Sequence, residues 1–144
     1  MSSLDEIDPS ELVMRRVLPS DGNTKRIDIV DGREQLTSPT MQPRENEDHL
    51  SFSRLKYTTP EALIELARVH LSPGQLVGVS VWGMTVAEVM QIEDGSGGNL
   101  CVLAKPTEED PGHCGIFSHE GKPYPPNSKA INRKLARTAR KLFP

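Results

Sequence analysis

The chain has 144 residues, of which 35% are hydrophobic and 4% aromatic, a size typical of one domain with a single core of moderate size. No stretch approaches the roughly 20 apolar residues of a membrane span. The acidic start of the chain lacks the basic and apolar regions of a signal peptide, and two cysteines are too few for a disulfide scaffold. These features predict a cytoplasmic protein with no membrane contact, folded as one domain over residues 1–144.

The charges are distributed unevenly, although the formal net charge is only −3. Residues 1–48 hold 11 of the 20 acidic residues and 6 of the 17 basic residues. Residues 129–144 hold six basic residues and no acidic residue. The chain therefore has an acidic front and a basic end, which is its clearest electrostatic feature.

The first third of the chain predicts little regular structure. We expect residues 1–11 to be loosely ordered. Residues 13–18 follow the helix-start signal Asp8-Pro9 but are short and rich in β-branched residues, so a helix and a strand both remain open. Residues 25–30 are consistent with one short strand closed by an Asp-Gly turn. Residues 37–48 contain two prolines and no periodicity, which predicts an irregular loop.

The middle of the chain carries clearer patterns. Residues 50–53 alternate apolar and polar, as in a half-buried strand. A helix is predicted to begin at Thr59, because a capping residue precedes proline and an apolar face follows. Residues 76–81 alternate valine with small residues and predict a strand that the following Trp-Gly pair could break. Residues 85–92 fit either a strand or one short helix.

The last third completes the predicted fold. Residues 100–104 are apolar on both faces and predict an internal strand, and residues 114–117 predict a final strand. Residues 129–142 have an apolar stripe at helical spacing and predict a terminal helix. The fold class is α+β, with a single small mixed sheet of about four to six short strands and two or three helices, one of them the basic C-terminal helix. The core is expected in residues 49–105 and this helix.

The terminal helix is the first candidate for binding, because its basic side chains cluster away from the apolar stripe. These side chains are Lys129, Arg133, Lys134, Arg137, Arg140 and Lys141. Clustered cations release counterions from a polyanion, so the helix could bind nucleic acid, dock on an acidic partner protein or simply be a solvated face. The scarcity of aromatic residues there speaks against single-stranded nucleic acid.

The second candidate is the turn from Asp110 to Gly115, which would present His113 at the start of a strand. His113 could act as a general base or as a ligand, or it could be a turn histidine that binds backbone groups. Neighbouring residues of a strand point to opposite faces, so His113 is not expected to activate Cys114, which is then a buried small thiol.

The other histidines have individual settings. His49 is expected to point to the same side as Ser51, His70 to pack on the apolar helix face and His119 to be exposed in a polar turn. There is no Cys-x-x-Cys, His-x-x-x-His or His-Glu-x-x-His pattern, no phosphate-binding loop and no nucleophile elbow. We therefore predict neither a metal site nor a cofactor.

Several short motifs occur in an order that resembles a loose family of small bacterial hypothetical proteins of unknown function. They are Arg15-Arg16-Val17, His49-Leu50-Ser51-Phe52, the Asp110-Pro111-Gly112-His113-Cys114 turn and the basic terminal helix. The family has an Arg-Arg strand, a Leu-Ser-Val-type strand, an Asn-Pro-x-His-Ala turn and a basic helix, and this chain departs from it at Gly112 and Cys114. The resemblance implies no activity, but it groups Arg16, His49, Ser51, Asp110 and His113.

Three functions follow as hypotheses. The first is a non-enzymatic interaction or accessory module that acts through a partner protein, because no strong catalytic motif is present and the charge is polarised. The second is a small enzyme or ligand-binding protein that uses Arg16, His49 and His113 on a phosphate-containing ligand. The third is nucleic-acid binding through the basic helix.

Overall fold

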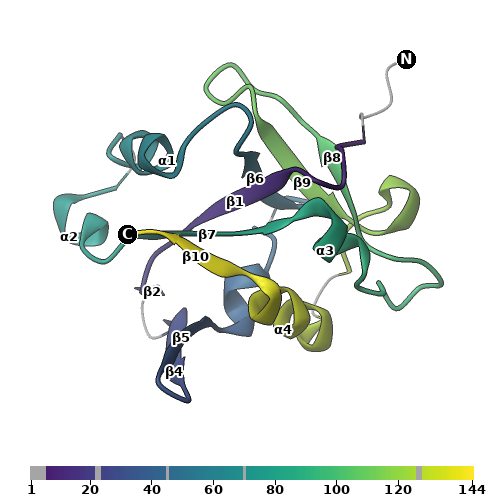
Figure 1. Cartoon of the computed structure of the whole chain (residues 1–144), viewed down its shortest axis with the longest axis horizontal. Helices are drawn as coiled ribbons and strands as arrows, with labels where there is room; N and C mark the ends of the chain where they lie inside the picture. The colour runs from purple at the N-terminus through teal and green to yellow at the C-terminus, as the bar shows by residue number, and fades with distance from the viewer. Residues whose placement is uncertain (1–5, 22–23, 45, 70, 126–127) are drawn as a thin grey trace.

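The computed structural model describes residues 6–21, 24–44, 46–69, 71–125 and 128–144 (Figure 1). The main sheet consists of β1 (Leu12–Val17), β6 (Leu50–Arg54), β7 (Ser80–Thr85), β8 (Cys101–Ala104), β9 (His113–Phe117) and β10 (Arg140–Phe143). Two small hairpins are formed by β2 (Ser20–Asp21) with β3 (Thr24–Lys25) and by β4 (Ile27–Val30) with β5 (Arg33–Leu36). The helices are α1 (Pro60–Ala67), α2 (Pro73–Leu76), α3 (Val86–Met90) and α4 (Lys129–Thr138), with 3-10 turns η1 (Ser38–Met41) and η2 (His119–Gly121).

The predicted α+β class is confirmed, and the strand order of the main sheet is β10-β7-β1-β6-β9-β8. Each strand pair in it is antiparallel, which corrects the expectation of a mixed sheet. The helices α1 and α2 lie in the connection from β6 to β7, two strands that run parallel to each other with β1 between them.

The segment after the Asp8-Pro9 signal is the strand β1 and not a helix. Asp8 instead forms a tight turn, in which its carboxylate accepts a hydrogen bond from the Ser10 backbone N–H at 2.8 Å. β1 pairs with β6 on one side and with β7 along its full length on the other. Pairing on both sides satisfies the backbone of this segment more completely than one short helix would.

The two faces of the sheet are covered differently. The first face carries the main core, in which α3, α4 and η1 pack on the strands; its largest members include Val13, Met41, Phe52, Trp82, Met84, Ile116 and Leu135. The second face is covered at β1 and β7 by α1, whose Leu63 packs against Met14 and Val81. Helix α1 begins as predicted, with the Thr59 side chain accepting from the Ala62 backbone N–H.

Strand β7 lies four residues later than the alternating pattern predicted. Gly78 has a φ of +80° and Val77 is exposed, so the strand begins only at Ser80. The Trp82-Gly83 pair does not break it, since β7 continues through both residues. A side chain at Gly83 would come within 2.6 Å of the Val13 carbonyl oxygen. The glycine therefore allows β1 and β7 to approach closely. For residues 85–92, where a strand and a short helix both remained open, the structure has the short helix α3 over Val86–Met90.

The predicted terminal helix is too long. Helix α4 ends at Thr138, Ala139 is extended, and Arg140–Phe143 forms β10, which pairs with the outer side of β7. The free edge of β7 provides hydrogen-bond partners that a longer helix would leave unused. Strand β8 was predicted to be internal, but it is the last strand of the order, at the opposite end from β10.

The front of the chain is more ordered than expected where it is described. Ile7 is buried and Glu6 forms a bridge with Leu103, whereas residues 1–5 lie outside the described residues. The segment 37–48 is not irregular throughout, because η1 buries Thr40 and Met41 against α4. The core therefore extends beyond residues 49–105. No helix in the described ranges is long and apolar enough to cross a membrane.

Candidate functional site

The polar side chains on β6 and β9 occupy the part of the second face next to the area that α1 covers. Ser53 lies opposite His113 and Ser51 lies opposite Gly115, so these positions share one face of the sheet. Met14 of β1 lies opposite Ser53, which places Arg16, two residues further, on this face as well. His49, His113 and Arg16 therefore lie on the same face of the sheet.

His49 and His113 approach each other closely on this face. Their ring centroids are 6.1 Å apart and their planes make an angle of 82°. The His49 ring also stacks on Phe117, with centroids 5.2 Å apart. It lies over Gly115, where a Cβ would come within 2.7 Å of His49 Cδ2. Glycine at this position therefore provides the space that His49 occupies.

Both imidazoles have a defined proton position. His49 Nδ1 lies 2.9 Å from a carboxylate oxygen of Asp48, and His113 Nδ1 lies 2.9 Å from the Lys105 carbonyl oxygen. Each partner only accepts hydrogen bonds, so the proton is on Nδ1 and the Nε2 lone pair is left for other contacts. The hydrogen bond from His49 lowers the pKa of Asp48.

Ser51 links His49 to an acidic neighbour. Its hydroxyl donates to Glu47 at 3.0 Å and lies 3.5 Å from His49 Nε2. His49 is only 5% exposed, whereas Ser51 and His113 are partly exposed. A ligand on this face can therefore touch the serine and His113 directly.

The turn before β9 is built as the sequence predicted. Asp110 accepts from the Gly112 backbone N–H at 3.0 Å, and its backbone carbonyl accepts from His113 N–H at 3.0 Å. The Asp110 carboxylate also accepts from the Ser53 hydroxyl. Cys114 points to the opposite face and is buried, as expected.

Arg16 and the neighbouring Arg44 lie near this part of the sheet, whereas Arg15 points to the first face, where its guanidinium lies over the Phe52 ring. Burial and the neighbouring Arg44 lower the pKa of Arg16, while the carboxylate of Asp110 raises it. Arg16 is exposed and donates to the Leu63 carbonyl oxygen at 3.1 Å. Burial, together with Arg44 and Arg26, lowers the pKa of Arg15 to about 10. Positive charge is therefore concentrated where β1 ends.

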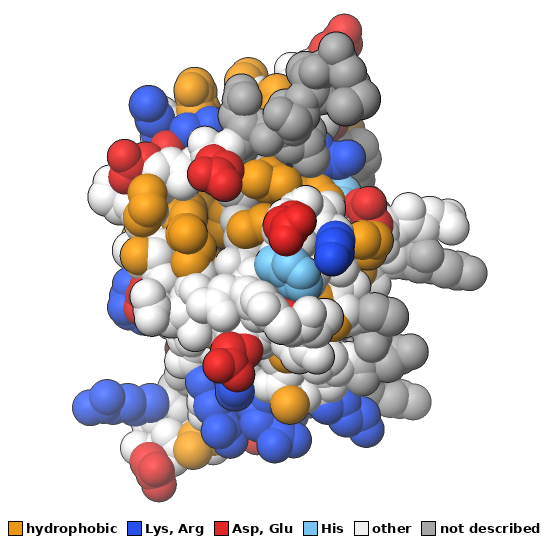
Figure 2. All heavy atoms as spheres, turned by 90° about the vertical axis from the view of Figure 1, so that its right-hand side faces the viewer, with side chains coloured by type: hydrophobic (Ala, Val, Ile, Leu, Met, Phe, Trp, Pro, Cys, Tyr) orange, Lys and Arg blue, Asp and Glu red, His pale blue; other side chains and the backbone are white. Residues whose placement is uncertain are grey.

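The six predicted binding residues divide between two elements. Lys129, Arg133, Lys134 and Arg137 are exposed on α4 and make no ion pair with any described residue. Arg140 and Lys141 lie instead on β10, where they pair with Glu88 and Glu34 at 3.0 and 2.8 Å. Figure 2 shows Lys and Arg side chains gathered near the lower edge of the molecule, at the level of α4 in Figure 1.

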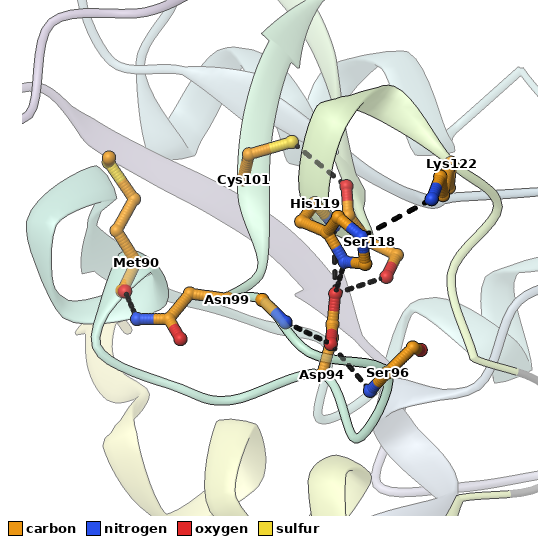
Figure 3. Close-up of polar contacts among 9 residues, drawn as sticks. Met90, Asp94, Ser96, Asn99, Cys101, Ser118, His119 and Lys122 are labelled. Atoms are coloured by element: carbon orange, nitrogen blue, oxygen red, sulfur yellow. Dashed lines mark hydrogen bonds and ion pairs between the residues drawn. The ribbon is translucent and has the colours of Figure 1, made fainter.

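A second polar centre was not predicted. The buried carboxylate of Asp94 accepts hydrogen bonds from the Ser118 hydroxyl, from the backbone N–H and Nδ1 of His119, and from the backbone N–H of Ser96 (Figure 3). His119 Nε2 lies 3.3 Å from Lys122 Nζ. His119 is therefore half-buried and paired, and not freely exposed as expected; its side chain is 19% exposed.

His70 lies outside the described residues. Among the described residues, no group of three or more His, Cys, Asp or Glu side chains is placed to hold a metal ion. Comparison of the chain with protein-family models, with curated proteins and with solved structures gives no match. The function has to be inferred from the two polar centres and the surface.

Proposed function

We propose that the second face binds a phosphate-containing ligand and that His49 and His113 move protons as a phosphate ester is cleaved there. The observation that carries this proposal is the approach of the two imidazoles, 6.1 Å apart on adjacent strands. Paired imidazoles are suited to phosphate chemistry because one can accept a proton while the other donates one.

Arginines supply the attraction for the phosphate. Arg16 is exposed on the same face and keeps guanidinium N–H groups that its one hydrogen bond to Leu63 does not use. A planar guanidinium binds two phosphate oxygens at once. Arg44 adds positive charge, since it is near enough to lower the pKa of Arg16. A bound dianion would relieve this repulsion.

The proton transfers follow from the positions of the two Nε2 atoms. A water molecule attacks phosphorus and gives its proton to His49 Nε2, which lies 3.5 Å from the Ser51 hydroxyl oxygen. The bond from phosphorus to the leaving oxygen breaks, and protonated His113 gives that oxygen its Nε2 proton. Asp48 holds His49 in the orientation that accepts a proton and offsets the charge that forms.

Binding is tested first with inorganic phosphate, by following the histidine ring signals in NMR. We expect the His113 signals to shift, and we expect the Arg16→Met variant to bind more weakly. Arg68→Met, which removes an exposed arginine paired with Glu65 on α1, is the matched control. Shifts that are absent, or that both variants weaken equally, would contradict the proposal.

Cleavage is tested with bis(4-nitrophenyl) phosphate, whose product is coloured. We expect His113→Asn to lower the rate by about 100-fold while the melting temperature stays close to that of the parent protein. Phosphate binding without turnover would leave the ligand-binding form of the proposal and remove the enzymatic one. A rate that His113→Asn does not change would show that cleavage occurs elsewhere.

A second candidate function is docking of a partner protein at the β4–β5 hairpin and α4. A surface hollow there is lined by Val30, Arg133 and Arg137, among others, and Ile29 beside it is 62% exposed. Apolar side chains beside unpaired arginines favour a partner segment with both acidic and apolar residues. This candidate corresponds to the interaction module of the first hypothesis and assigns its partner to the surface of the β4–β5 hairpin and α4.

A synthetic peptide of alternating Glu and Leu, titrated into the labelled protein, tests this candidate. We expect NMR shifts at the hairpin and α4, which the double variant Arg133→Glu, Arg137→Glu abolishes. Lys56→Glu, at an exposed lysine just after β6, is the control outside this surface. Shifts elsewhere would exclude the surface, and duplex DNA binding that weakens steeply with salt and with the same double variant would assign it to nucleic acid instead.

A further inference from the structure

Asp94 and Lys122 contact the two ring nitrogens of His119 in an arrangement that suits a nucleophilic imidazole. The Nδ1 proton of His119 is bound by the carboxylate of Asp94, so the Nε2 lone pair is on the other side of the ring. That Nε2 lies 3.3 Å from the Lys122 ammonium, which is at the surface (Figure 3). Gly98 packs against the ring, since a Cβ there would lie 2.5 Å from His119 Cγ.

This combination distinguishes His119 from the other histidines that the structure describes. His49 also has a carboxylate on Nδ1, but its ring is buried and its Nε2 lies 3.7 Å from Glu47. Its Nε2 therefore faces a carboxylate, which suits a base that accepts a proton from water and not direct attack on a phosphoryl group. His113 has only a neutral carbonyl on Nδ1. Only His119, of these three, has a carboxylate behind the ring and a cation in front of it.

We propose that His119 is a phosphoryl-acceptor site, at which Nε2 takes a phosphoryl group from a small donor such as a phosphoramidate or an acyl phosphate. With phosphoramidate, the Nε2 lone pair forms the new bond to phosphorus as the phosphorus–nitrogen bond of the donor breaks. The leaving nitrogen departs as ammonia with its own three protons. The His119 ring keeps its Nδ1 proton and becomes cationic.

The surroundings of the ring match the charges that this step creates. Burial raises the pKa of Asp94, but its hydrogen bonds with Ser118, His119 and Ser96 outweigh burial and hold the pKa well below the ordinary value of 3.8. The carboxylate therefore stays ionised at neutral pH and offsets the cationic ring. The ammonium of Lys122, 3.3 Å from Nε2, moves aside from the lone pair as phosphorus approaches and then neutralises the transferred phosphoryl oxygens.

The test is to incubate the full chain with potassium phosphoramidate at neutral pH and to follow phosphohistidine by ³¹P NMR and peptide mass spectrometry. We expect phosphate on Nε2 of His119, formed faster than on His113 and faster than on His119 of the protein unfolded in urea. We expect the His119→Gln variant to lose this signal.

Two further variants separate a chemical role from a structural one. Lys122→Met is expected to slow labelling by about tenfold, because a hydrogen bond to a charged group is lost. Lys56→Met, which removes an exposed lysine just after β6, is expected to leave the rate unchanged. Asp94→Asn is expected to slow labelling further, and a melting curve shows whether that variant is still folded.

Three results would overturn the proposal. They are labelling of His119 no faster in the folded than in the unfolded protein, attachment at Nδ1, and an equal rate in Lys122→Met and Lys56→Met. The Lys122 comparison remains decisive if Asp94→Asn fails to fold. None of these readouts depends on His49 or Arg16. The phosphate-ester proposal and the phosphoryl-acceptor proposal can therefore fail independently of each other.

Discussion

Replacement of Leu135 by alanine tests how α4 is held to the sheet. Leu135 has no exposed surface and lies in the main core with Ile131 and Ala136. Truncating a fully buried leucine costs about 3 kcal/mol, within a range of roughly 2 to 5, because apolar contacts are lost and a cavity remains. For a chain of this size, that loss lowers Tm by about 10 °C.

The alternative is that charge attraction between the basic end and the acidic front holds the helix. Arg137→Ala, the matched exposed control on the same helix, should then be the more harmful variant. We expect it to change the free energy of unfolding by less than about 0.5 kcal/mol, since exposed charges are well screened. Urea unfolding of both variants at low and high salt measures the difference. A loss below about 1 kcal/mol for Leu135→Ala, or a larger and salt-dependent loss for Arg137→Ala, would refute the packing account.

Three further outcomes are expected. Gly115→Ala should displace the His49 ring, remove the NOE between the two histidine rings and cost about 1 to 3 kcal/mol in urea unfolding; an unchanged NOE would contradict the close packing. The hydrogen bond and charge of Arg54 lower the pKa of Glu11, so their pairing stabilises the fold at neutral pH and is lost as the pH falls through the lowered pKa. The difference in unfolding free energy between the parent protein and Arg54→Met should therefore be largest near pH 7 and shrink below pH 4.5, the ordinary pKa of glutamate; a constant difference would contradict this. Burial raises the pKa of Cys114 to about 12, so iodoacetamide should modify this thiol only after unfolding, as mass spectrometry can show; equal rates in both states would contradict its burial.

Elements that depend on local signals could be predicted from the sequence. Helix α1 has a capping threonine, a first-turn proline and an apolar face, and the structure begins it at Pro60. Strands β6 and β9 follow their short patterns. The turn between β4 and β5 has positive φ at Asp31 and Gly32, as the Asp-Gly signal predicts.

Elements that depend on distant partners were predicted less well. The helix periodicity of the terminal segment continues to Leu142, but the free edge of β7 pairs with Arg140–Phe143 as a strand. Strand β8 is apolar on both faces, yet it is at the end of the strand order. Its Val102 and Leu103 are buried all the same, so apolar faces indicated burial and not position in the sheet.

The two polar centres differ in how far the sequence could indicate them. The grouping of His49 and His113 came from short motifs, and their 6.1 Å approach depends on the register of β6 with β9, which no local pattern encodes. The centre around Asp94 was missed because its residues are 24 and 25 positions apart and match no motif. The stretch after Asp94 is rich in glycine, yet the buried carboxylate fixes its backbone by accepting hydrogen bonds from Ser96 and Gly98.

The position of β1 has a consequence for how the protein is made. This strand is the first of the main sheet to be synthesised, but it lies in the middle of that sheet, where Val13 pairs with Arg54 and Met84. A newly made β1 therefore waits, with both edges unpaired, until the segments that form β6 and β7 have left the ribosome. Pairings between such distant segments slow folding, and unpaired apolar strands are prone to aggregate. The nascent chain is therefore most prone to aggregate before the segment that forms β7 has left the ribosome.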